Sequence, residues 1–134
     1  MAMIVLVGSV ALAQTPPVDP ALYEEGRIQF DFLCVHCHQP DGTGRPPIFP
    51  ALAGNDRLGD LSLIVGNVHN GKGMMPAFAN LAPDTIAALA TYVRNSWGNA
   101  FGGVTAIEVD AVLTTLAAEP GVVSVPGAIV APVD

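Results

Sequence analysis

Apolar residues recur at helical spacing in three stretches of the chain. The stretch from Ala21 to Leu33 and the stretch from Pro83 to Ser96 both predict amphipathic helices, because their apolar residues return every three or four positions. A shorter run from Leu61 to Val68 predicts another short helix. The positions that we expect to be buried in the two long helices are Leu22, Ile28, Phe30, Leu33, Ile86, Leu89, Ala90 and Val93.

A fourth helix is marked by its start signal. Thr105 and Glu108 match the capping box S/T-x-x-E, which predicts a helix that runs to about Ala118. No stretch alternates apolar and polar residues clearly enough to predict a sheet. The pattern therefore favours an all-α domain over residues 21–118, with the last helix as a C-terminal extension.

Proline and glycine separate the predicted helices. Residues 39–60 are rich in both and predict a long loop, and residues 70–73 predict a turn. Residues 14–20 are typical of a proline-rich linker. Residues 120–133 carry no charge, and we expect residues 119–134 to form a disordered tail. A docking strand or a segment that wraps a partner is the alternative for this tail.

The first residues of the chain resemble a secretory signal. Residues 1–13 are apolar and end in Ala-Leu-Ala, which is a typical cleavage pattern, although the usual basic start is missing. As a helix, this segment would reach roughly 20 Å, which is short of the ~30 Å core of a bilayer. We therefore expect a signal peptide over residues 1–13, export to a bacterial periplasm, and no stable membrane insertion after its removal.

Composition and charge narrow the classes of function. The chain has 134 residues, a length that suits one domain, and its net charge is −7 from twelve acidic and five basic side chains. This charge argues against nucleic acid as a partner and against binding to anionic membranes. Hydrophobic residues make up 51% of the chain but aromatic residues only 6%. We expect a small core to which a buried cofactor adds apolar mass.

The run Cys34-Val35-His36-Cys37-His38 is a C-x-x-C-H motif, the attachment signature of c-type haem. Two thiols one helical turn apart can each add across a vinyl group of the same porphyrin, and the histidine that follows becomes an iron ligand. A thioredoxin-like pair would need a βαβ setting, and a structural zinc site would need further ligands. We predict one covalent haem c on Cys34 and Cys37, with its iron on His38. The chain shows no internal repeat, so a second haem is not indicated.

Three further features accompany this motif: Pro50-Ala51-Leu52, the pair Met75-Pro76, and the amphipathic helix that ends near Trp97. With them, the chain from about Tyr23 to Trp97 resembles the class I monohaem cytochromes c of the small bacterial periplasmic type. The resemblance implies an all-α fold in which three to five helices wrap around one covalent haem.

The same resemblance implies roles for individual residues. The Pro50 carbonyl would accept a hydrogen bond from Nδ1 of His38, Leu52 would pack on the porphyrin, and Met75 would be the second iron ligand. In the crossing of the first and last core helices, Gly26 and Phe30 would pack against Leu89 and Tyr92.

Several alternatives stay open for these residues. Pro46 and Pro47 compete with Pro50, and Met74 competes with Met75, although spacing favours Pro50 and the following proline favours Met75. We expect His36 to be partly exposed and His69 to lie in a polar surface turn rather than at the iron. Trp97 is expected to serve packing rather than electron relay.

The resemblance implies a one-electron carrier and not an enzyme. Such a carrier passes electrons between an exported dehydrogenase or respiratory complex and an acceptor, either free or as a subunit. The expected partner is therefore a redox protein, namely a dehydrogenase, an oxidase or a respiratory complex. Charged residues are sparse around the motif and the methionine loop, so we expect an uncharged docking face. The alternatives are a haem peroxidase or ligand-binding sensor with an open sixth site, and a haem-free thiol oxidoreductase.

Overall fold

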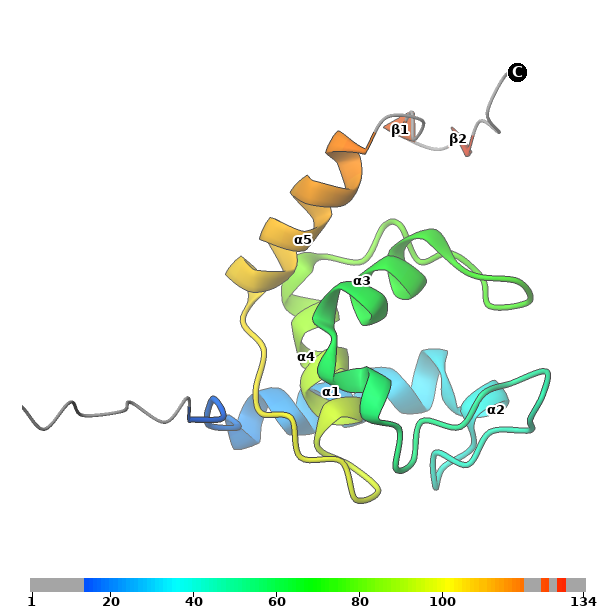
Figure 1. The fold of residues 1–134 in the computed structure, drawn as a ribbon, viewed down its shortest axis with the longest axis vertical. Coiled ribbons are helices and arrows are strands. Elements are labelled where there is room, and N and C mark those ends of the chain that lie inside the picture. The colour runs from blue at the N-terminus through cyan, green and yellow to red at the C-terminus, as the bar shows by residue number, and fades with distance from the viewer. Residues whose placement is uncertain (1–13, 120–123, 126–127, 130–134) are drawn as a thin grey trace, which may run out of the picture.

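Two helices cross near the centre of the molecule and organise the fold (Figure 1). They are α1 (Pro20–Leu33) and α4 (Pro83–Arg94), and they form the most extensive helix pair of the structure. The structure is a computed structural model that describes residues 14–119, 124–125 and 128–129. Apart from the two short strands given below, the described elements are helical, which confirms the prediction of an all-α fold.

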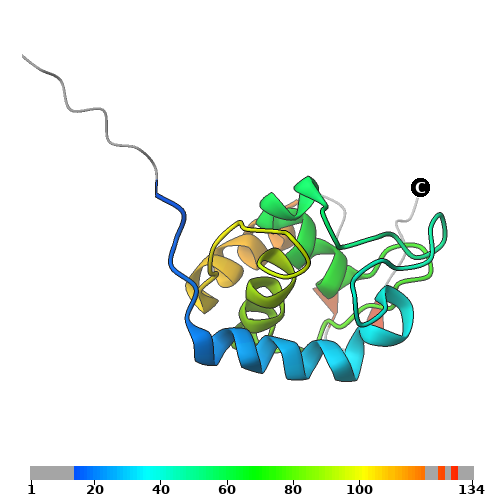
Figure 2. The same cartoon turned by 90° about the horizontal axis from the view of Figure 1, so that it is seen from below.

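Helix α1 begins at a well-formed N-cap. The Asp19 carboxylate accepts hydrogen bonds from the backbone N–H groups of Ala21 and Leu22, at 2.8 and 3.3 Å. Pro20 follows in the first turn, where its missing N–H costs nothing. Figure 2 shows α1 running along one side of the molecule and leading directly into the short helix α2 (Val35–His38).

The crossing of α1 and α4 depends on Gly26. A Cβ at Gly26 would lie 2.0 Å from the carbonyl oxygen of Ala88 and 2.8 Å from Cβ of Tyr92. Glycine is therefore required for the two backbones to approach this closely. The expected contact with Tyr92 is present, but Ala88, rather than Leu89, is the residue that meets Gly26. Leu89 lies next in sequence and lines the cavity described below.

An aromatic cluster packs beside this crossing. The ring of Phe30 lies 5.3 Å from that of Tyr92 and 5.2 Å from that of Trp97, measured between centroids. The indole N–H of Trp97 donates to the Pro40 carbonyl at 3.1 Å. Trp97 thus ties the loop after α2 to the end of α4, in agreement with the packing role expected for it.

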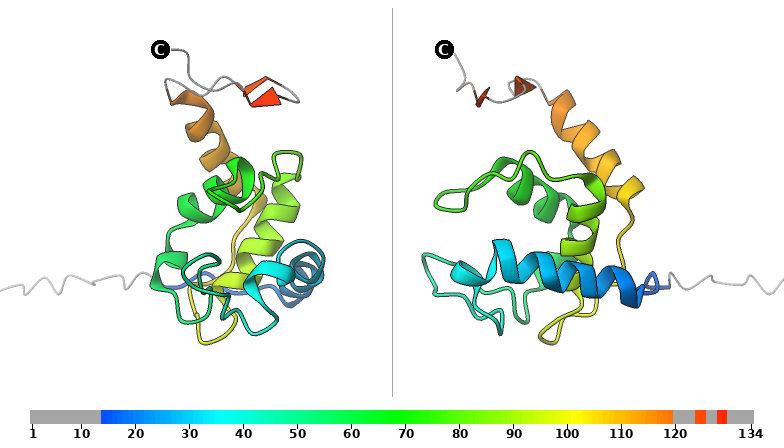
Figure 3. Two further views of the ribbon diagram at one scale, coloured as in Figure 1. Left: turned by 90° about the vertical axis from the view of Figure 1, so that its right-hand side faces the viewer. Right: turned by 180° about the vertical axis from the view of Figure 1, so that it is seen from behind.

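Three further helical segments complete the domain: η1, a 3₁₀ helix (Asp56–Gly59), α3 (Leu61–Asn70) and α5 (Ala106–Ala118). Both hydrogen bonds of the predicted capping box, between Thr105 and Glu108, are present at the start of α5. This helix packs against α3 and α4, on the side remote from α1 (Figure 3). The predicted short helix is confirmed as α3, which ends two residues later than expected.

Burial on α1 differs from the prediction. Phe30 is fully buried, whereas Leu22 and Leu33 are half-buried and Ile28 is 39% exposed. Two residues correspond to about 200° of rotation around a helix, so Ile28 faces away from both Gly26 and Phe30. Among the described elements, only α4 packs closely against α1, and one narrow face of α1 is therefore buried.

The C-terminal segment contains a pair of two-residue strands, β1 (Ser124–Val125) and β2 (Ala128–Ile129). They pair antiparallel, with Ser124 opposite Ile129 and Val125 opposite Ala128. The sequence favoured a disordered tail here, with a docking strand as the alternative, and at these four residues the structure has two short strands. The other residues of the predicted tail after Glu119, and the predicted signal peptide, lie outside the described residues. Among the described helices, none has the length and apolar character needed to cross a membrane.

Candidate functional site

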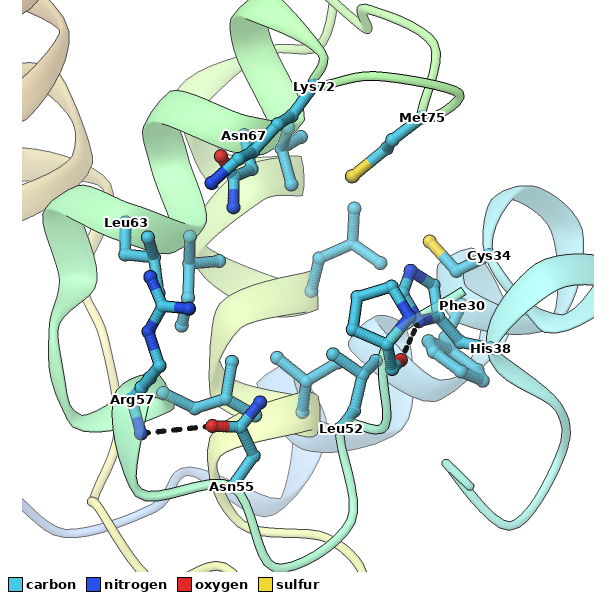
Figure 4. Close-up of a pocket in the computed structure, with 16 residues that line it drawn as sticks. Phe30, Cys34, His38, Leu52, Asn55, Arg57, Leu63, Asn67, Lys72 and Met75 are labelled. Carbon is cyan, nitrogen blue, oxygen red and sulfur yellow. Dashed lines mark hydrogen bonds between the residues drawn. The ribbon is translucent and has the colours of Figure 1, made fainter. Parts of the chain in front are cut away.

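The site begins where α1 ends. The Cys34 N–H donates to the Phe30 carbonyl at 2.9 Å, and the His38 N–H donates to the Cys34 carbonyl at 3.0 Å. Cys34 and His38 are therefore one helical turn apart and face the same cavity (Figure 4). Both cysteines are free thiols, and Cys37 lines an adjoining cavity.

The ring of His38 is oriented by a backbone carbonyl. Its Nδ1 lies 3.0 Å from the oxygen of Pro50, as expected from the resemblance. A carbonyl only accepts, so Nδ1 carries the proton and Nε2 keeps the lone pair that binds a metal. This contact selects Pro50 over Pro46 and Pro47, which are both exposed and make no such contact within the described residues.

Glycines in the preceding loop bring the Pro50 carbonyl to its place. Gly44 has a φ of +63°, and a Cβ there would lie 2.4 Å from the Phe49 oxygen and 2.7 Å from the Pro50 oxygen. Gly42 has a φ of +68°, and its carbonyl accepts from the N–H groups of Leu52 and Ala53 at 2.7 and 2.9 Å. The loop thereby places both Pro50 and Leu52 on the cavity wall.

Two adjoining cavities, with volumes of about 200 and 290 Å³, lie between α1, α3, α4 and the loops. They share Cys34, His38, Pro50, Asn67, Lys72 and Met75, and most of the remaining lining is apolar. The apolar lining of the first cavity consists of Phe30, Leu52, Leu58, Leu63, Ile64, Val68, Leu89 and Val93.

Met75 projects into this space from the loop after α3, and its sulfur points toward the cavity (Figure 4). Backbone hydrogen bonds of 3.0 and 3.1 Å between Lys72 and Met75 close the loop. Gly71, with a φ of +72°, leaves room for the Met75 carbonyl, which would lie 2.7 Å from a Cβ there. Met74 is 72% exposed and lines only the second cavity.

Cys34 is poorly suited to thiolate chemistry. Burial raises the pKa of the Cys34 thiol to about 11, and the neighbouring Cys37 adds to the shift. A thiol with such a pKa stays protonated at neutral pH, whereas redox-active cysteines have lowered pKa values. The electrostatics therefore disfavour the thiol oxidoreductase alternative.

The predicted residues gather in one place, and the structure adds others to them. Cys34, His38, Pro50, Leu52 and Met75 all line the first cavity, and Cys37 lines the second. Sequence reasoning missed four polar residues of the lining, which are Asn55, Arg57, Asn67 and Lys72. The only available signal was Asn67, a polar residue on the apolar face of the predicted helix. Within the described residues, no group of three His, Cys, Asp or Glu side chains forms a metal site.

Comparison with known proteins shows the family to which the chain belongs. Residues 21–93, more than half of the chain, match the family described as cytochrome c oxidase, cbb3-type, subunit III. The chain belongs to this cytochrome c family. The family match confirms the resemblance to class I monohaem cytochromes c. It covers α2, η1 and α3, and nearly all of α1 and α4.

Curated relatives are similar over the same region. The cytochrome subunit of fructose dehydrogenase from Gluconobacter japonicus is 32% identical over 99 residues, which are 61% of this chain and 20% of the relative. The cytochrome c subunit of the quinone-type alcohol dehydrogenase from Gluconacetobacter polyoxogenes is 35% identical over 91 residues, which are 57% of this chain and 19% of the relative. A cytochrome c-552 from Thermus thermophilus is 29% identical over 114 residues, which are 71% of this chain and 69% of the relative. The chain thus spans about one fifth of the two dehydrogenase subunits.

Family membership bears on the chemistry of the site. The matched family is a cytochrome c family, which implies electron transfer as the activity of this domain and haem c as the cofactor. The donor set fits that group, because the apolar cavity brings two thiols, one imidazole and one thioether to its walls.

Proposed function

We propose that this cytochrome carries single electrons on one haem c, bound covalently through Cys34 and Cys37 and ligated at iron by His38 and Met75. The observation that carries the proposal is the convergence of these four side chains on one cavity lined mostly by apolar residues. When bound, the haem would supply the Fe(III)/Fe(II) couple.

The protein residues would hold the haem and adjust its reduction potential. The hydrogen bond from His38 to Pro50 fixes the imidazole ring and raises its basicity as a ligand. A thioether ligand favours the reduced iron and raises the potential, and the apolar lining acts in the same direction by excluding water. Leu52 would contact the porphyrin from the wall that also carries Pro50.

The attachment can be tested directly. In the mature protein, the haem should stay with the denatured chain, and the pyridine haemochrome spectrum should indicate two saturated thioether links. Cys34→Ala should leave one link or abolish maturation. Haem that extracts into acidified organic solvent would overturn covalent attachment, and a five-coordinate high-spin spectrum would instead favour a peroxidase or ligand sensor.

The partner that we propose is a redox protein outside the cytoplasm, namely a dehydrogenase, an oxidase or a respiratory complex. Support comes from the relatives, two of which are named as cytochrome subunits of dehydrogenases. Ile48 and Met74, which line the second cavity, are 61% and 72% exposed and offer uncharged side chains beside the site, where Lys72 is the one charged residue of the same lining.

The salt dependence of electron exchange tests this docking face. An uncharged face predicts a second-order rate with a physiological partner that changes little with ionic strength. A steep fall as salt shortens the Debye length to about 8 Å would show charge steering and contradict the uncharged face.

A further inference from the structure

The two methionines of the loop after α3 have opposite surroundings. Of the four methionines in the chain, Met1 and Met3 fall in the predicted signal peptide, and Met74 and Met75 are adjacent. Met74 is 72% exposed, whereas Met75 is half-buried and its sulfur points toward the cavity (Figure 4). After removal of the predicted signal peptide, the chain would therefore keep one accessible thioether and, next to it, one enclosed thioether.

A tight turn keeps the two side chains apart. Lys72 and Met75 exchange two backbone hydrogen bonds, with N···O distances of 3.1 and 3.0 Å, so Gly73 and Met74 form the tip of the turn. Gly73 has a φ of +57°, and a Cβ there would meet no atom of the described residues within 4 Å beyond its chain neighbours. The tip of the turn therefore projects into open space while Met75 stays beside the cavity.

The accessibility of a thioether determines how readily an oxidant reaches it. Oxidation of methionine to its sulfoxide converts a flexible apolar side chain into a polar one, and reductases reverse the change. A hydroperoxide in solution can approach the sulfur of Met74 at the open tip of the turn. The sulfur of Met75 is enclosed by the cavity, and under the proposed function its lone pair is engaged at iron. The two neighbours should therefore differ in reactivity.

The position of Met74 gives its oxidation a functional consequence. Met74 and Ile48 both line the second cavity and supply exposed apolar side chains to the proposed docking face. A sulfoxide at position 74 would carry a strong hydrogen-bond acceptor, which must lose its water when a partner covers the face. Removing water from a polar group without a new hydrogen bond is unfavourable. Oxidation of Met74 would therefore weaken docking and leave the iron ligands in place.

We propose that Met74 is a site of reversible oxidation by hydroperoxides, and that its sulfoxide slows electron exchange through the docking face. This inference rests on the proposed haem site and docking face. With hydrogen peroxide, the sulfur lone pair attacks one oxygen, the O–O bond breaks, and the proton of the transferred oxygen passes to the departing hydroxide to give water. Sulfur loses two electrons and the peroxide gains them. A thiol-dependent reductase restores the thioether and releases water, while two thiols are oxidised to a disulfide.

The test treats the holoprotein and the variants Met74→Leu and Met74→Gln with hydrogen peroxide. Leucine keeps an apolar side chain of similar volume without sulfur, and glutamine imitates the polarity of a sulfoxide. Tandem mass spectrometry of the tryptic peptide 73–94 locates the added oxygen, and the far-red band of thioether–Fe(III) ligation reports on Met75. Electron self-exchange between ferric and ferrous copies of the protein, measured by NMR line broadening, reports on docking.

We expect the first oxygen atom to add to Met74 while the far-red band persists, and methionine sulfoxide reductases to remove it. The sulfoxide form and Met74→Gln should exchange electrons about tenfold more slowly than the untreated protein, which corresponds to ~1.4 kcal/mol. Peroxide should not slow Met74→Leu relative to its own untreated rate.

Two results would overturn the inference. One is oxygen that adds first to Met75, with loss of the far-red band. The other is an exchange rate that stays the same after Met74 has been oxidised. Both are read on the unmodified chain, so they do not depend on the maturation of a variant. A far-red band that is missing before any peroxide is added would instead overturn ligation by Met75, and with it the proposed function.

Discussion

Alanine in place of Gly26 is expected to force apart the helix pair that supports the site. The new Cβ would lie 2.0 Å from the Ala88 carbonyl oxygen, whereas ordinary contact begins at 3.4 Å, so α1 and α4 would have to separate by about 1.4 Å, the difference of the two values. The clash involves the backbone of α4, which side-chain rotation cannot relieve. Such overpacking costs up to about 3 kcal/mol, and the better helix propensity of alanine returns about 1 kcal/mol. We expect a net loss of about 2 kcal/mol.

Gly66 in α3 provides a matched control. A Cβ at Gly66 would find one neighbour, Cδ1 of Leu116 at 3.9 Å, which is an ordinary contact. Gly66→Ala should therefore stabilise the protein by about 0.5–1 kcal/mol, through the propensity gain alone. The same substitution at two helical glycines thus has opposite expected signs.

Guanidinium unfolding of the two holoprotein variants, followed by circular dichroism at far-ultraviolet wavelengths, measures both effects. The Gly26→Ala variant should unfold at lower denaturant concentration than the unmodified protein, and the Gly66→Ala variant at higher concentration. If Gly26→Ala were as stable as Gly66→Ala, the two backbones would not approach as closely as the structure shows. The reasoning about the crossing would then be refuted.

Three other perturbations test the site and its supports. Met75→Ala should abolish the weak far-red band of thioether–Fe(III) ligation while Met74→Ala keeps it, and the reverse pattern in visible spectra would move the ligand to Met74. Asn99→Ala leaves buried backbone groups without partners and should destabilise the protein by about 2–4 kcal/mol in the same unfolding assay; an effect under about 0.5 kcal/mol would contradict the anchoring role. The pKa of Glu108 is lowered by its hydrogen bonds from Thr105, so its ionised form supports α5 above the ordinary glutamate pKa. Glu108→Gln should therefore be less stable than the unmodified protein at pH 7, and the difference should shrink as pH falls through the lowered pKa; a constant difference from pH 7 to 3 would exclude this linkage.

The sequence alone determined the features that depend on residues close together in the chain. The apolar spacing predicted α1, α3 and α4, and the capping box predicted the start of α5, because helix formation and capping involve residues within one or two turns. The C-x-x-C-H motif is equally local, since two thiols and an imidazole follow one another on a single helical turn. A family resemblance then supplied Pro50, Leu52 and Met75 from their spacing along the chain.

Only the tertiary structure decided which of several similar residues makes a given contact. Pro50 rather than Pro46 or Pro47 reaches His38, because a loop with two left-handed glycines brings that one carbonyl within 3.0 Å. Ile28 is apolar but faces away from α4, so its hydrophobicity alone could not predict its exposure.

The place of Arg57 in the lining of the first cavity could not be predicted from the sequence either. Nothing in the sequence around Arg57 distinguishes it from the other arginines, because its position depends on Asn55 and on Asn99, which lies after α4. The two asparagines are 44 positions apart in the chain. Contacts between such distant residues follow from how helices and loops pack in three dimensions, and no local pattern in the sequence encodes them.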